Sequence, residues 1–241
     1  MPLNHFHARS FIYVVFVSML TFASAIAAPI GAVSRVSGDV VLDRTGAPPQ
    51  SIKADDPVNV GDRLTTAKGA EVLIRFKDQS VLTLRPDSSV TLTQFKFEET
   101  GGDAFFAKLL KGALRSVSGL IGKSHPQNVK FATQTATIGI RGTDFEVVIL
   151  PEDAGDARAG TYDYVHEGVT SLELANPAEG PKSIDVKPEE TGLALAYPRP
   201  GESALQILKQ RPAFLRGGGF DAHMMQFSSQ PMRVIQRMPG R

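Results

Sequence analysis

The segment 136–145 places two glycines, an arginine and an aspartate within a longer run of strand-forming residues, 131–150. Valine, isoleucine, threonine and phenylalanine favour a pleated, half-buried surface, whereas glycine weakens a strand unless a bulge or a bend requires it. An unpaired charge in such a run is costly, so its charges need nearby partners. The pattern predicts a strand–turn–strand corner in which Arg141 pairs with Asp144 or with backbone carbonyls. The corner comprises Arg141, Gly142, Thr143 and Asp144.

Two interpretations of this corner are open. In the structural one, Arg141 and Asp144 form a salt bridge and the hydroxyl of Thr143 completes its hydrogen bonds. In the functional one, the corner is a recognition spot exposed on a turn, because turns often carry binding residues. The structural interpretation is the default, since charges within strand runs are usually paired.

Other residues that could do chemistry lack the spacing that it needs, so we expect no catalytic, cofactor-binding or metal-binding residues. The triplet 122–124, Gly-Lys-Ser, resembles the end of a phosphate-binding loop, but valine stands where the loop's first glycine belongs. Pro126 would also interrupt the helix that must follow. His125, His166 and His223 are far apart in sequence, and their spacing is not that of helical metal ligands.

The N-terminus predicts a secretory signal peptide over residues 1–27. Arg9 precedes an apolar run, Phe11–Phe22, and the small residues Ala25-Ile26-Ala27 fit the cleavage rule. The alternative is an uncleaved inner-membrane anchor, although the apolar stretch is short for a span of about 20 residues. We therefore expect a periplasmic or exported protein.

Composition excludes several classes of protein. The 241 residues include 26 basic and 25 acidic side chains, and Arg9 lies in the leader, so the remaining chain is neutral. Nucleic-acid-binding proteins carry a basic excess, so we expect no nucleic-acid partner. The chain has no cysteine, which excludes disulfides, zinc–thiolate sites and thiol catalysis.

Short β runs separated by turn residues extend from 30 to 197 and predict an all-β fold, an antiparallel β-sandwich, jelly-roll-like or a β-roll, with one or two short helices. Ser37-Gly38-Asp39 predicts a hairpin turn. The clearest amphipathic hairpin turns at Lys77-Asp78-Gln79, and a change of phase between Leu92 and Phe95 predicts a bulge near Gln94.

Helix signals are few. Asp103 before an apolar stretch and Gly112 after it predict a short helix over 104–111, and residues 203–210 indicate another. Residues 198–241 carry seven basic and two acidic side chains, three consecutive glycines and few periodic apolar positions. They predict a basic, loosely ordered C-terminal tail. We therefore divide the chain into a leader (1–27), a β core (28–150), further strands (151–197) and this tail.

Four blocks together resemble the FecR domain family in order and spacing, over roughly 30–197. They are 61–66, 72–80, 112–115 and 135–145, and the Ile-Arg-Gly-Thr-Asp-Phe sequence at 140–145 is the most specific. The resemblance implies a periplasmic β domain, best known in sensors that relay the state of an outer-membrane transporter to a sigma factor. Only ten residues precede the apolar leader, too few for the family's cytoplasmic sigma-binding region. We therefore expect the stand-alone, exported form of the domain.

These observations predict a non-enzymatic binding, signalling or scaffolding module of the bacterial cell envelope. Its expected partner is an envelope protein or a cell-wall component, and the leader or the basic tail could add contact with a membrane. The alternative is an envelope hydrolase whose carboxylates converge only in three dimensions. A pocket with two acids, or with a histidine–acid pair, would favour that alternative.

Overall fold

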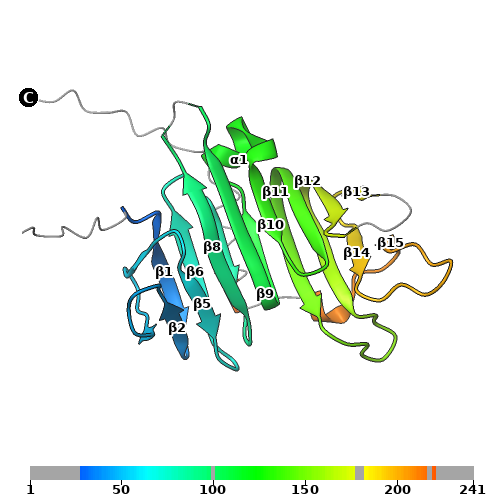
Figure 1. Cartoon of the computed structure of the whole chain (residues 1–241), viewed down its shortest axis with the longest axis horizontal. Helices are drawn as coiled ribbons and strands as arrows, with labels where there is room; N and C mark the ends of the chain where they lie inside the picture. The colour runs from blue at the N-terminus through cyan, green and yellow to red at the C-terminus, as the bar shows by residue number, and fades with distance from the viewer. Residues whose placement is uncertain (1–27, 99–100, 177–181, 216–218, 221–241) are drawn as a thin grey trace, which may run out of the picture.

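The computed structural model describes residues 28–98, 101–176, 182–215 and 219–220, and the predicted leader lies outside them. Within this part the chain is almost entirely β, which confirms the all-β prediction (Figure 1). No described helix is long and apolar enough to cross a membrane. The strands are β1 (Gly31–Ser37), β2 (Val40–Asp43), β3 (Gln50–Ser51), β4 (Pro57–Val58), β5 (Arg63–Thr66), β6 (Glu71–Phe76), β7 (Val81–Leu84), β8 (Ser89–Lys96), β9 (Ala104–Val117), β10 (Val129–Ala132), β11 (Ala136–Leu150), β12 (Gly160–Leu174), β13 (Ser183–Val186), β14 (Thr191–Leu195) and β15 (Leu205–Leu208). The short helices are α1 (Leu120–Ser124), η1 (Pro126–Asn128) and η2 (Ala213–Leu215).

All the strands join into one sheet that divides into two halves, because three long strands change partners midway. The β8 half-sheet contains β2, β3, β5, β8, β10, β13 and the parts 104–111, 136–141 and 169–174 of the long strands. The β6 half-sheet contains β1, β4, β6, β7, β14, β15 and the parts 112–117, 144–150 and 160–167. The single parallel pairing among the described strands joins β9 to β10.

The two half-sheets enclose the main apolar core. Core residues come from both of them, for example Ile74 and Leu82 from the β6 half-sheet and Leu92 and Leu109 from the β8 half-sheet. A chain of contacting aromatic rings, with centroids 4.7–5.7 Å apart, runs through the core: Phe95, Phe76, Phe105, Phe131 and Phe145. This packing supplies the stability that a chain without disulfides must obtain from apolar burial.

Two local predictions are confirmed. β6 and β7 form the predicted antiparallel hairpin around 77–79. The register of β8 against β9 shifts between Leu92 and Gln94, which is the predicted bulge and turns Phe95 toward the core.

Three local predictions are wrong. Gly38 does turn the chain, but β1 pairs with β4 and β6 while β2 pairs with β3 and β5, so the turn joins the two half-sheets and forms no hairpin. Residues 104–111 belong to β9, because Phe105, Ala107 and Leu109 alternate with outward-facing neighbours at the period of a strand. The third, the helix at 203–210, is replaced by β15, which pairs with β14.

Part of the predicted tail packs on the sheet, and the structure describes residues 198–215 and 219–220 of it. After β15, Leu215 is fully buried against Tyr162 and Leu193 on the outer face of the β6 half-sheet. Phe220 packs on Leu73 and Val81 of the same face. The backbone N–H groups of Gly219 and Phe220 donate to the carboxylate of Glu71 at 2.9 and 3.0 Å. The tail's remaining residues, 221–241, lie outside the described part.

Asp163 is a buried acid near the start of β12. It is fully buried between Val147 of β11 and Gly192 of β14, and its Oδ2 accepts the hydroxyl of Thr170 at 2.5 Å. Its Oδ1 has no hydrogen-bond partner among the described residues. Burial raises the pKa of Asp163 to about 7, and the hydrogen bond from Thr170 opposes this only in part.

This raised pKa sets the sign of a pH dependence. Between about pH 4 and pH 7 the folded state keeps a proton on Asp163 that the unfolded state releases, so the free energy of unfolding falls as pH rises. We expect Asp163→Asn to remove a slope of up to about 1.4 kcal/mol per pH unit in this window. Urea denaturation at several pH values measures it, with Asp185→Asn as an exposed control. An unchanged slope in Asp163→Asn would contradict the assignment.

Candidate functional site: the bulge at residues 141–144

The predicted corner is a bulge within one continuous strand, β11. The register against β12 runs from Arg141 opposite Val169 directly to Asp144 opposite Glu167, so Gly142 and Thr143 lie outside the ladder. At this point β11 also exchanges β10 for β9 as its neighbour. The prediction of a bend is therefore correct in position, but the chain continues in the same strand and does not turn back.

Gly142 and Gly168 explain why the bulge forms at this place. Both adopt left-handed φ angles, +60° and +80°, which residues with a Cβ rarely adopt. A Cβ on Gly168 would lie 2.2 Å from the carbonyl oxygen of Gly142. β12 therefore has an irregularity of its own at Gly168, which contacts the bulge of β11 directly. An alanine at 168 would push β11 and β12 apart.

Arg141 is exposed and pairs with a residue that the sequence did not indicate. Its guanidinium contacts Asp185 of β13 at 2.5 Å, and the two side chains are 56% and 54% exposed. The predicted pairing of Arg141 with Asp144 is wrong, because Asp144 pairs with Arg115 of β9 and Arg141 pairs with Asp185 of β13. The outer end of the bulge thus presents an arginine and an aspartate to solvent.

Thr143 anchors the bulge to the loop that precedes α1. Its backbone N–H donates to the hydroxyl oxygen of Ser118 at 2.8 Å, and that hydroxyl donates to the carbonyl of Thr143 at 2.8 Å. Thr143 is buried. Its predicted structural role, completing the hydrogen bonds of the corner, is performed mainly by its backbone.

Asp144 is buried and forms a pair with Arg115 of β9. The two oxygens of its carboxylate accept from Nε and Nη2 of Arg115 at 2.9 and 2.7 Å, a two-point geometry that gives strong, directional binding. Asp144 and Arg115 are both nearly inaccessible to solvent. The pair therefore fixes the position of β11 relative to β9 immediately after the bulge.

A second buried charge lies two residues along β11, and the sequence analysis missed it. Glu146 is completely buried and contacts Arg85 at 3.1 Å, His166 at 2.6 Å and Arg211 at 3.0 Å. Burial alone would raise the pKa of Glu146, but the hydrogen bond with His166 and the nearby cations outweigh it, so this pKa lies below its ordinary value. Arg211 also stacks 3.8 Å above the ring of Tyr164 and donates to the carbonyl of Leu215. The cluster attaches the C-terminal segment to the sheet.

The other residues that were searched for chemistry are dispersed. Gly122 and Lys123 lie within α1, a helix of five residues. His125 bonds to Ser124, His166 bonds to Glu146, and His223 lies outside the described residues. Across the described ranges, no group of three histidine, aspartate or glutamate residues is arranged to hold a metal ion.

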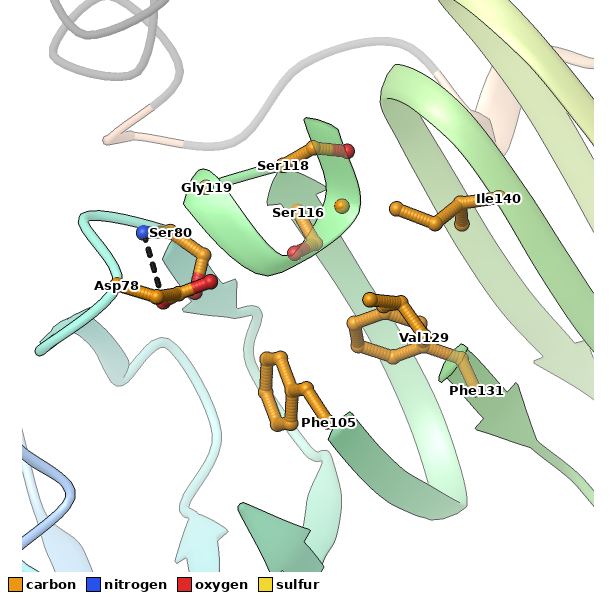
Figure 2. A pocket seen from close by; sticks show the side chains of 10 residues that line it. Asp78, Ser80, Phe105, Ser116, Ser118, Gly119, Val129, Phe131 and Ile140 are labelled. Atoms are coloured by element: carbon orange, nitrogen blue, oxygen red, sulfur yellow. Dashed lines mark hydrogen bonds between the residues drawn. The ribbon is translucent and has the colours of Figure 1, made fainter. Parts of the chain in front are cut away.

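A small cavity lies between α1 and the two half-sheets (Figure 2). Asp78 and Ser80 line one side of it, and Phe105, Phe131 and Ile140 line the other. Asp78 is its only carboxylate. Burial raises the pKa of Asp78, and the hydrogen bonds from Ser80 oppose this. The volume of about 10 Å³ is close to the lower limit for one water molecule.

The two charged residues that bracket the bulge, Arg141 and Asp144, predict different costs on mutation. Asp144→Ala leaves Arg115 charged and buried, so it should lower the free energy of unfolding by about 3–5 kcal/mol. Arg141→Ala removes an exposed ion pair and should cost no more than about 1 kcal/mol. Chemical denaturation of both variants measures the difference. Equal costs would show that the buried pair of Asp144 and Arg115 does not stabilise the bulge more than the exposed ion pair does.

Comparisons with known proteins place this geometry in a family. Residues 62–163 match the family model described as FecR protein, and no curated protein matches. Two solved structures from Parabacteroides distasonis ATCC 8503, both described as a candidate anti-sigma factor, are 13% identical and have TM-scores of 0.46 and 0.44. In each case the alignment covers 61% of this chain and 59% of the other chain.

A third solved structure, described as a cell surface anchoring domain, is 25% identical over 28% of this chain and 88% of its own, with a TM-score of 0.27. The family match contains the bulge, Arg115, Glu146 and Asp163, and it confirms the resemblance drawn from the sequence blocks. Residues 62–163 of this chain are therefore a FecR domain.

Proposed function

We propose that this protein is a non-enzymatic module of the bacterial cell envelope that binds another molecule through the exposed end of its 141–144 bulge. The observation that carries the proposal is the contrast between the two ends of the bulge. At one end of the bulge Arg141 pairs with Asp185 on the surface, while at the other end Asp144 is buried in a pair with Arg115. A charged pair on a rigid support is suited to recognition, because little side-chain and backbone freedom is lost on binding.

The arrangement of charges favours binding over catalysis. Glu146 and His166 form a histidine–acid pair, which was the feature that would favour a hydrolase. However, two arginines also hold the carboxylate, and Glu146 has no exposed surface. A general base must reach the proton that it abstracts, and this carboxylate is enclosed. The cavity at Asp78 is too small for a substrate, so neither place favours the hydrolase alternative.

The proposed location is the periplasm or the cell exterior, reached through the leader at 1–27. The absence of cysteine is compatible with export of a domain that relies on its apolar core. A signalling role is the version that the FecR family implies, in which the bulge reports the state of an envelope partner. A scaffolding role would use the same surface, with an envelope protein or a cell-wall component as partner.

Exchanging the two exposed charges tests this function. The variant Arg141→Asp/Asp185→Arg keeps an ion pair on the surface but inverts the charges that a partner meets. We expect it to fold with the stability of the wild type and to lose its envelope partner in periplasmic cross-linking, because like charges then face one another at the contact.

The photoreactive residue is placed at Glu167, an exposed residue of β12 opposite Asp144 that the charge exchange leaves unchanged, and the matched control is Arg35, an exposed arginine on β1. A product that forms from 167, is absent from 35 and disappears in the charge-exchanged variant supports the proposal. The proposal fails if 167 gives no product, or if the exchanged variant cross-links as the wild type does.

A further inference from the structure

The outer face of the β8 half-sheet carries a concentration of positive charge. Three complete strands, β5, β8 and β10, and the 104–111 part of β9 lie side by side in the sheet (Figure 1). These four segments contain five basic residues and no acidic residue. The chain after the leader is neutral overall, so the acidic residues that balance this positive charge lie in other segments of the protein. The basic residues are Arg63, Lys96, Lys108, Lys111 and Lys130.

Three of these cations form a group across neighbouring strands. In the register of the sheet Arg63 lies opposite Thr91, and Thr91 lies opposite Lys108. Lys130 lies opposite Phe106 on the next strand, diagonal to Lys108. One strand separates Arg63 from Lys108, so their backbones are about 10 Å apart. We call Arg63, Lys108 and Lys130 the basic row.

The basic row is available to a ligand. All three of its side chains are exposed. Among the ion pairs formed within the described ranges, the one that involves these four segments joins Lys96 to Glu98, at the end of β8. Asp43 of β2 lies opposite Arg63 in the register but forms no ion pair with it, so within the described ranges a ligand displaces no existing ion pair of the row, which removes a common cost of binding a charged partner.

The surface between the cations is mostly polar. Thr91 and Thr93 place hydroxyl groups there, and Phe106 and Leu110 are its partly exposed apolar side chains. A helix or a surface that inserts into a bilayer buries a broad apolar face, which these strands lack. Hydroxyls, a partly exposed ring and separated cations instead match a hydrated polymer that carries hydroxyl and acidic groups, because each kind of group on the polymer meets a suitable partner.

We propose that the basic row binds an anionic polysaccharide of the cell envelope, with Arg63, Lys108 and Lys130 contacting its acidic groups. This inference rests on the proposed envelope function and adds a second binding face to it. Arg141 and the basic row lie in the same half-sheet but are different residues, so one protein can hold a polymer while it contacts another partner.

The test compares the purified protein with two double variants of equal net charge. Lys108→Glu/Lys130→Glu reverses two members of the row. Lys53→Glu/Lys187→Glu reverses two exposed lysines outside these four segments, beyond β3 and β13. The probe is fluorescently labelled polygalacturonate, with labelled dextran as the neutral polymer. Equimolar phosphatidylglycerol–phosphatidylcholine vesicles test for a membrane surface.

We expect the wild type to bind polygalacturonate, to ignore dextran and vesicles, and to bind more weakly as the salt concentration rises. The row variant should lose at least about tenfold in affinity, since each reversed lysine near a charged ligand changes binding by roughly this order. The control variant should keep its affinity. Thermal unfolding of both variants verifies that each is folded.

Three results would overturn the inference: no binding of polygalacturonate by the wild type at low salt, an equal loss in both variants, or binding to vesicles in place of the polymer. The last result would assign the row to a membrane surface. None of them affects the cross-linking beside the bulge, so a failure of the basic row is distinguishable from a failure of the proposed function.

Discussion

The fold depends on a change of phase that three strands make together. In β9 the core-facing residues are odd-numbered up to Leu109 and even-numbered from Leu114. In β11 they are even-numbered up to Ile140 and odd-numbered from Phe145, and β12 makes the corresponding change between Val165 and Leu172. Side chains alternate strictly along a strand, so each change needs an irregular residue. Gly112, Gly142 and Gly168 lie at the three changes, and each has a positive φ angle.

These aligned changes let the same three strands serve both half-sheets. Without them, the apolar residues of one half would point to solvent, since a slip of one residue reverses every side chain. The buried pair of Arg115 and Asp144 lies next to two of the changes and joins β9 to β11. Removing either partner leaves a buried charge, so the pair specifies this register against its neighbours. The exposed Arg141 is a consequence of the same bulge, which connects the framework of the fold to the proposed recognition site.

How far the sequence predicts this arrangement depends on how local the interaction is. Alternation predicted the strands and the bulge near Gln94, and the same test applied between Ile140 and Phe145 would have identified a bulge there. Arg115, the partner of Asp144, is 29 residues away from it, and Arg211, a partner of Glu146, is 65 residues away from that glutamate. Neither pairing can therefore be predicted from spacing within a short stretch of sequence. The helix expected at 104–111 failed because strand pairing on both sides outweighs a capping signal. Residues 205–208 became a strand for a similar reason, since an edge of the sheet was available to them.

The central claim is that the changes of phase at Gly112, Gly142 and Gly168 form one structural unit. Amide hydrogen exchange of the Gly168→Ala variant tests this claim most directly. A Cβ at this position would force apart the contacting bulges of β11 and β12. If the three changes of phase are coupled, amide exchange should accelerate in 112–117 of β9 and 136–150 of β11 as well as in 160–174 of β12, because all three strands lose register together. Faster exchange confined to the residues beside 168 would contradict the account.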